Sequence, residues 1–347
     1  MKMYKETLKK LSLVGIPLAV ATLLYTFITG GQDCFGQYTI NTSTSAIGVT
    51  PVLVYYVFTA VLFAFYGFSF LFKRSASDLY HSLPVPRADM YLSVTLATAT
   101  WMGATILLNV LSMTALLLIG GCPFVPAYIP LLILFYFVAS MLVFAAAAVG
   151  CALSGSYVTA LASTGLVLFL PRFVQFIFAR GLVANVSIIG WTDLGALLSP
   201  LSNVATGLLV MQSRNMFIYH IVSMPYILYS LLLAALELAL GAWLFMRRPS
   251  ETAERGATNK GWAVATACLL AFALLLMITV DSHQLFSVYG AAITAVALLG
   301  FVLYGFISLR SVKGVLKSLP FFLLSAALAF CVSLGIHSLV DNTLSVT

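Results

Sequence analysis

Long uninterrupted apolar runs dominate this chain and limit the folds that are open to it. A helix that crosses a bilayer needs about 20 mostly apolar residues. Nine segments provide them: Leu11–Thr29, Pro51–Phe72, Met90–Ile119, Ile129–Leu153, Val158–Phe178, Met224–Met246, Trp262–Val280, Val288–Leu309 and Leu319–Leu339. Only 8% of the residues are charged, and a soluble domain with so few charges would expose large apolar patches. We therefore expect an all-α, polytopic transmembrane helical bundle.

The basic residues indicate how these spans are oriented. With the N-terminus inside, the cytoplasmic stretches hold Lys2, Lys5, Lys9, Lys10, Lys73, Arg74, Arg87, Arg247, Arg248, Arg255, Lys260, Arg310, Lys313 and Lys317. Only Arg172, Arg180 and Arg214 then fall in the fifth span or outside. Cytoplasmic loops concentrate Lys and Arg, so we predict a cytoplasmic N-terminus in a multi-pass cell-membrane protein. The net charge of +7 is explained by this topology and does not indicate a nucleic-acid partner.

The spans divide into two groups at a charged stretch. Residues 1–10 form a basic cytoplasmic segment, residues 11–246 hold six spans, and residues 247–261 form a charged cytoplasmic linker. Residues 262–347 hold an appended bundle of three spans. Between the fifth and sixth spans, the apolar segment 192–211 is broken by Ser199 and Pro200. Such a segment suits a re-entrant helix pair on the outer side, where surrounding protein covers its broken backbone.

The loop between the second and third spans, Lys73–Tyr91, has the pattern of a short surface helix. Ser75 and Asp78 fit a capping box that starts a helix. One apolar stripe follows at positions i, i+3, i+4 and i+7, formed by Ala76, Leu79, Tyr80 and Leu83. Pro84 ends the helix, and Pro86 stiffens the return to the third span. A helix of roughly two turns is marginal alone. The pattern leaves two docking surfaces open, the membrane lipid interface and a groove on a cytoplasmic partner.

Two strings in this region and beyond it resemble one transporter family. DLYHSLPVPRADMYLS resembles the hSLPxxR cytoplasmic loop of Firmicute-type ABC-2 permeases, the membrane subunits of ATP-driven exporters, and FMRRPSETAERG resembles the Arg-x-x-Glu segment after their sixth span. The resemblance implies a six-span permease core, an elbow helix over residues 1–10, and a coupling helix over residues 75–87. In that family the coupling helix seats in a separate ATP-binding subunit. The role would fall here on Asp78, Leu79, Tyr80, His81, Ser82, Leu83, Pro84 and Arg87.

The resemblance also implies partners, a location and a substrate class. The partners are an ATP-binding cassette subunit and a second permease, in a homodimer or heterodimer within the bacterial plasma membrane. The exported substrate would be a hydrophobic compound, a peptide or an antibiotic. The chain has no P-loop, no G-x-S-x-G and no H-E-x-x-H motif. We therefore expect no enzyme activity and no cofactor in this chain, with ATP and Mg²⁺ bound by the partner subunit.

Two other functions remain as alternatives. An ion-coupled secondary transporter would use intramembrane acidic groups, and Glu237 is the residue well inside a span that could serve. A charge at that depth costs at least about 2.5–3.5 kcal/mol. Glu237 therefore either acts on a substrate or is protonated or paired inside the bundle, with Arg172 as one partner within reach. The other alternative is a non-transporting immunity or sensor protein of the membrane.

The cysteines give two further alternatives. The topology places Cys34 and Cys122 outside, where an oxidising exterior would permit a disulfide between them. Free, buried thiols are the other interpretation. The pattern of cysteines and histidines provides no metal site.

Overall fold

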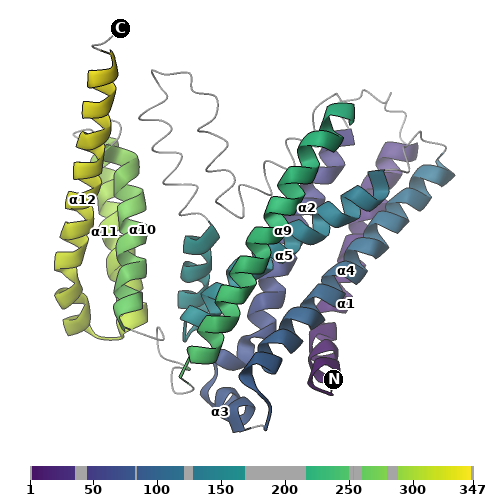
Figure 1. Cartoon of the computed structure of the whole chain (residues 1–347), viewed down its shortest axis with the longest axis horizontal. Helices are drawn as coiled ribbons and strands as arrows, with labels where there is room; N and C mark the ends of the chain where they lie inside the picture. Colours follow the sequence, from purple (N-terminus) through teal and green to yellow (C-terminus); the bar gives the residue numbers. More distant parts are fainter. Residues whose placement is uncertain are drawn as a thin grey trace. The chain divides into compact units, whose positions relative to one another are not determined.

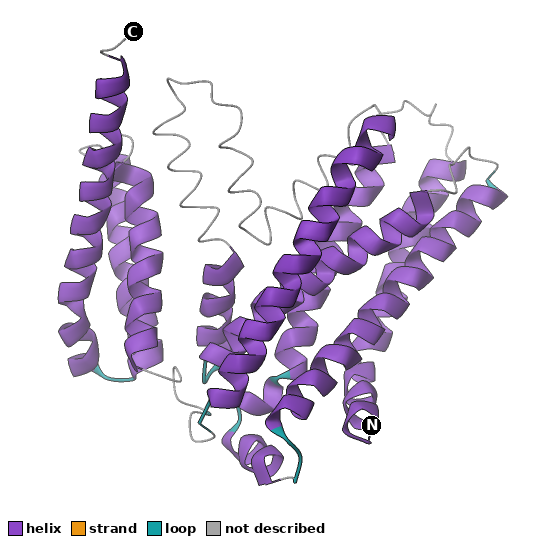
Figure 2. Ribbon diagram, viewed as in Figure 1, coloured by secondary structure: helices purple, strands orange, loops and turns teal. Residues whose placement is uncertain are grey.

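The computed structural model describes residues 2–35, 45–82, 84–120, 128–168, 216–249, 253, 260–279 and 288–344. Within these ranges every regular element is helical, as Figure 2 shows, so the predicted all-α class is confirmed for this part of the chain. Segment 192–211, predicted to be re-entrant, lies outside the described residues, as does most of the linker 247–261.

Six of the described helices are long and apolar enough to cross a membrane. They contain the segments Met3–Ile28, Arg87–Leu116, Ile129–Leu153, Ile227–Arg247, Ala291–Leu309 and Val312–Val332. The other three predicted spans correspond to shorter apolar helices in the described part, at Val54–Gly67, Tyr157–Leu168 and Lys260–Leu276. The chain is thus a multi-pass helical membrane protein by the length and composition of its helices.

The chain separates into two compact units. The first unit contains α1 (Lys2–Phe35), α2 (Ser45–Gly67), α4 (Arg87–Ile119), α9 (Met216–Arg247) and most of α5 (Tyr128–Leu153). The second contains residues 71–78, the end of α5, the Tyr157–Leu168 helix, α10 (Lys260–Thr279), α11 (Val288–Leu309) and α12 (Val312–Leu344). Neither unit is one continuous stretch of sequence, since residues 71–78 and the Tyr157–Leu168 helix belong to the second unit.

In the first unit, α1 lies along α4 (Figure 1). Gly15 permits the close approach, since a Cβ at this position would lie 2.6 Å from the ring of Trp101. That ring is held in turn by a 3.0 Å hydrogen bond from Trp101 Nε1 to the Leu8 carbonyl. Farther along, Asn109 donates to Thr26 Oγ1 at 2.8 Å. A small residue and interhelical polar contacts are the usual means by which membrane helices associate.

An aromatic layer joins four elements of the first unit at one end. Phe68, which directly follows α2, lies 5.5 Å from Tyr91 of α4, 6.3 Å from Phe144 of α5 and 6.1 Å from Phe245 of α9, between ring centroids. All four side chains are buried. Ring pairs at these distances are favourable beyond the area that they bury. The layer therefore connects the end of α2, the start of α4 and the end of α9 to α5, next to the loop that contains the predicted surface helix.

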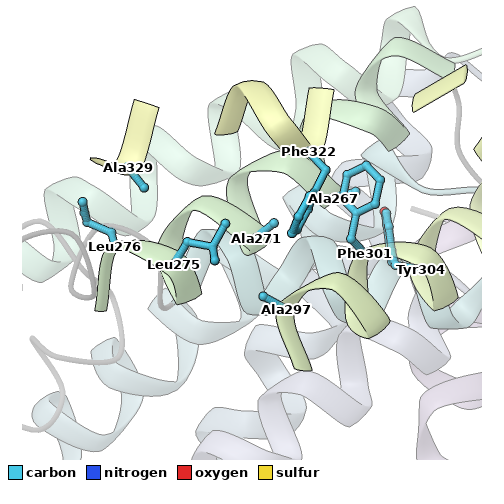
Figure 3. Packing of buried hydrophobic residues seen from close by; sticks show 9 residues of the cluster. All are labelled: Ala267, Ala271, Leu275, Leu276, Ala297, Phe301, Tyr304, Phe322 and Ala329. Atoms are coloured by element: carbon cyan, nitrogen blue, oxygen red, sulfur yellow. The ribbon is translucent and has the colours of Figure 1, made fainter. Parts of the chain in front are cut away.

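The second unit has its own core between α10, α11 and α12. Figure 3 shows its nine buried residues: Ala267, Ala271, Leu275, Leu276, Ala297, Phe301, Tyr304, Phe322 and Ala329. Within it, the rings of Phe301 and Phe322 lie 5.3 Å apart between centroids. A tight turn joins α11 to α12, with Arg310 in the left-handed region at φ 51°. The alanines let these three helices approach closely.

Candidate functional site around the short helix α3

The predicted surface helix is present and is called α3 (Arg74–Ser82, nine residues). It follows a 3-10 turn, η1 (Ser69–Leu71), that begins two residues after α2 ends. The first helical hydrogen bond runs from the Ser77 amide to the Lys73 carbonyl, at 2.8 Å. Lys73 therefore occupies the N-cap position, and the predicted capping box of Ser75 with Asp78 is wrong. Buried Phe70 and Phe72 fix how the chain enters the helix, so packing rather than Ser75 decides where it begins.

The end of α3 agrees with the prolines in the sequence. The helix ends at Ser82, whose hydroxyl donates to the Leu79 carbonyl at 2.8 Å. Pro84 follows two residues later and is exposed. Pro86, with φ −57° and ψ 139°, precedes the first residue of α4. Leu83 and the side chain of His81 lie outside the described residues.

The predicted apolar stripe of α3 is divided between two environments. Tyr80 is half-buried and stacks on Phe70 at 4.4 Å between ring centroids, with 17° between the planes. Leu79, in contrast, is 63% exposed and lies on the open face of the helix with Ser75, Asp78 and Ser82. No described residue covers Leu79, a large apolar side chain among polar neighbours. Tyr80 attaches α3 to Phe70, whereas the Leu79 side chain remains exposed.

Lys10 of α1 lies within a cage made of Tyr66, Ser69, Phe70 and Tyr80, which we call the Lys10 cage. Its ammonium nitrogen is 5.5 Å from the ring centroid of Tyr66, 5.9 Å from that of Phe70 and 5.7 Å from that of Tyr80. It also donates to Ser69 Oγ at 3.1 Å. Each distance to a ring is within the range of a cation–π interaction. Burial, and secondarily the negative charge of Glu6, raise the pKa of Tyr80, so this ring stays a neutral phenol at physiological pH.

From the sequence alone, Lys10 is one of several basic residues predicted to be cytoplasmic. The signal that could have separated it from Lys9 is its place directly before the apolar run. There, a long side chain can lie along neighbouring apolar surface. The structure bears out this difference, because Lys9 is exposed and Lys10 is partly buried.

Arg87, which the family resemblance assigned to partner binding, has an internal contact. Its Nη1 donates to the Met246 carbonyl at 3.2 Å, so the start of α4 is attached to the last turn of α9. Carbonyls in the last turn of a helix lack intrahelical donors, and a cation is favourable there. Arg87 thus helps to position the loop that it ends.

Arg248 is a second arginine that sequence reasoning did not single out. It is 5% exposed, and it donates to the Cys151 carbonyl at 2.7 Å and to the Leu71 carbonyl at 2.9 Å. Cys151 belongs to the last turn of α5, where carbonyls need outside donors. Burial lowers the pKa of Arg248 to about 10, so the guanidinium remains charged at neutral pH. This residue belongs to the Arg-x-x-Glu string; Glu251 of that string lies outside the described residues.

Glu237 lies on the buried side of α9. It continues a stripe of buried residues formed by Ile227, Ser230, Ala234, Gly241 and Phe245. At 1.5 Å per residue it is about 15 Å from the Arg247 end of the helix, near mid-membrane depth. Its Oε2 atom is buried and has no hydrogen-bond partner among the described residues. Arg172, the proposed partner, lies outside the described ranges, so that pairing remains a prediction.

Of the five cysteines, the structure describes the side chains of three. The Cys34 side chain and all of Cys122 lie outside the described residues, so the disulfide also remains a prediction. Cys151, Cys268 and Cys331 are free thiols. Across the described ranges, no three His, Cys, Asp or Glu side chains gather in a way that could hold a metal ion.

No protein-family model, curated protein or solved structure matches this chain.

Proposed function

We propose that this chain is the membrane-spanning permease subunit of an ATP-driven, ABC-2-type exporter. The exposed Leu79 on α3 carries the proposal: a short helix in a loop between two spans presents an apolar side chain that no described residue covers. The resemblance of DLYHSLPVPRADMYLS to the coupling loop of that family supports the same assignment. In this proposal the N-terminus is cytoplasmic, and six spans form the core with three more appended.

The proposed mechanism divides the chemistry between two polypeptides. The partner subunit binds and hydrolyses ATP with Mg²⁺, and Leu79 fills a groove on it in the helix-in-groove mode. Closure of two such subunits pushes on α3. The displacement rocks the spans and opens a path between this chain and a second permease, through which a hydrophobic compound, peptide or antibiotic leaves.

The test is a pull-down of the detergent-purified chain, co-expressed with its genomic neighbours and assayed for a bound ATPase. Leu79→Asp removes about 1–3 kcal/mol of apolar burial and adds a charge that must be desolvated, so we expect association to weaken by at least tenfold. Val312→Asp is the matched control. Val312 is 59% exposed and begins α12 on the same predicted side of the membrane, but lies outside the proposed interface.

The outcomes separate the proposal from its alternatives. Recovery of a P-loop ATPase with the wild-type chain and with Val312→Asp, and its loss with Leu79→Asp, supports the permease assignment. Equal recovery with both variants contradicts the role of Leu79. A chain that purifies alone contradicts the proposal as a whole and favours an ion-coupled transporter or an immunity or sensor protein.

A second candidate function, the ion-coupled secondary transporter, is favoured by one observation. The buried Oε2 of Glu237 has no hydrogen-bond partner within the described region, and an intramembrane carboxyl of this kind can carry a proton. In proteoliposomes with an imposed pH gradient, the wild-type chain alone would then take up protons, and Glu237→Gln would not. Absence of proton uptake by the wild-type chain excludes this candidate.

A further inference from the structure

The Lys10 cage joins α1 to the segment from the end of α2 to α3, which lies far from α1 in the sequence. Lys10 comes from α1, whereas the rings come from the end of α2 (Tyr66), from η1 (Phe70) and from α3 (Tyr80). Ser69 accepts a hydrogen bond from the same ammonium at 3.1 Å. A single side chain of α1 therefore contacts each successive element of the segment that leads into α3.

These contacts matter for α3 because the helix is short. Nine residues are too few to hold a helix in place without tertiary contacts. Tyr80 is the large α3 side chain that packs inward in the described part, on Phe70 at 4.4 Å. Lys10 lies within reach of both of these rings. The cage thus determines where α3 sits relative to α1.

On its other side, α1 is attached to α4. The Leu8 carbonyl, two residues from Lys10, accepts the hydrogen bond from Trp101 at 3.0 Å. One turn beyond Lys10, Gly15 packs directly against the ring of Trp101, and Thr26 accepts a hydrogen bond from Asn109 at 2.8 Å. A displacement of α1 therefore reaches α4 over much of the membrane-crossing length.

We propose that Lys10 is the positioning residue that transmits movement of α3 to the α1–α4 pair through its aromatic cage. The inference rests on the proposed function for the source of the movement, namely an ATP-binding subunit docked on Leu79. Within this chain, the cage makes the inner end of α1 and α3 move together. Without the charge of Lys10, α3 can shift while α1 stays in place.

The first experiment measures hydrogen–deuterium exchange of the detergent-purified chain without any partner. Lys10→Met keeps most of the apolar stem but removes the charge, and we expect α3 amides to exchange about tenfold faster, as for loss of a partly desolvated cation–π contact. Lys10→Arg keeps the cation and restores protection. Lys9→Met is the matched control, since Lys9 is adjacent but exposed, and it leaves exchange unchanged. Equal exchange in Lys10→Met and Lys9→Met overturns the proposal.

The second experiment measures transmission in the complex with the ATPase, trapped with ATP and vanadate. In the wild-type complex, trapping changes exchange in both α3 and residues 2–16 of α1. In the Lys10→Met complex, we expect the change in α3 to remain and the change in α1 to disappear. A response of α1 that survives in Lys10→Met contradicts transmission through Lys10.

The two experiments separate failure of this inference from failure of the proposed function. If no ATPase binds the wild-type chain, the permease assignment fails, while the exchange result on the isolated chain still stands. If the ATPase binds Lys10→Met normally and α1 still responds, the inference fails and the permease assignment remains.

Discussion

Replacement of Arg248 by methionine tests whether a buried cation holds the end of α5. The guanidinium is 5% exposed and serves two carbonyls through different nitrogens: Nη1 binds Cys151 O at 2.7 Å, and Nη2 binds Leu71 O at 2.9 Å. Nη1 also lies 3.5 Å from the Ala152 carbonyl. Methionine fills much of the same volume but donates no hydrogen bond.

The change in the free energy of unfolding depends on two opposing contributions: the hydrogen bonds that are lost and the buried charge that is removed. Hydrogen bonds that involve a charged donor contribute about 1.5–3 kcal/mol each, so two of them correspond to roughly 3–6 kcal/mol. The variant no longer buries a cation, which offsets part of this loss. It leaves the Leu71 carbonyl without this donor, and it leaves Cys151 O with a longer bond of 3.4 Å from the Ser154 amide. We expect the free energy of unfolding to fall by about 2–5 kcal/mol.

The assay is equilibrium unfolding of the purified chain in mixed micelles of detergent and SDS, with Arg247→Met as the matched control. Arg247 is the preceding residue; it is exposed and lies 4.2 Å from the ring centroid of Trp243. Its loss should cost no more than about 1 kcal/mol. The stability of Arg248→Lys should lie between that of the wild type and that of Arg248→Met. A lysine keeps the charge, but its single nitrogen cannot occupy the positions of both Nη1 and Nη2. Equal destabilisation by Arg247→Met and Arg248→Met would refute the reasoning.

Two further predictions concern the packing of α1 on α4. Gly15→Ala should lower the free energy of unfolding by about 1–3 kcal/mol, because the new Cβ would lie 2.6 Å from a ring that the Leu8 carbonyl holds in place. Gly300→Ala, with no atom within 4 Å of its Cβ, should be neutral or stabilising in the same assay; a loss as large as that of Gly15→Ala would contradict the argument. A double-mutant cycle of Asn109→Leu and Thr26→Val should give a coupling energy of about 0.6–1.7 kcal/mol for their 2.8 Å hydrogen bond. Additive effects in that cycle would show that the bond contributes nothing.

The helical class and the position of the short loop helix could be predicted from the sequence because both depend on local patterns. Apolar runs long enough for a bilayer are read directly along the chain, and six of the predicted spans reappear as long apolar helices. Pro84 and Pro86 restrict their neighbours whatever the tertiary fold, and α3 ends at Ser82, just before them. The N-cap of α3 was predicted wrongly, because the packing of Phe70 and Phe72 overrides the preference of Ser75.

The roles of individual basic residues could not be predicted in this way. Lys9 and Lys10, or Arg247 and Arg248, are identical in type and adjacent in sequence, and the same topology rule applies to both members of each pair. Only the structure shows that Lys10 enters an aromatic cage and that Arg248 binds buried carbonyls. Whether a cation is solvated or buried depends on which helix ends lie beside it.

The sequence by itself determined that this chain is a helical membrane protein with a short helix in a polar loop, since helix length, hydropathy and proline restraints act over a few neighbouring residues. The tertiary structure alone decided that Tyr80 faces inward while Leu79 stays exposed. It also decided that Lys10 meets rings between 56 and 70 positions away, and that Arg248 binds carbonyls 97 and 177 positions away. Such contacts depend on the packing of whole helices, and no local pattern encodes which distant side chains that packing brings together.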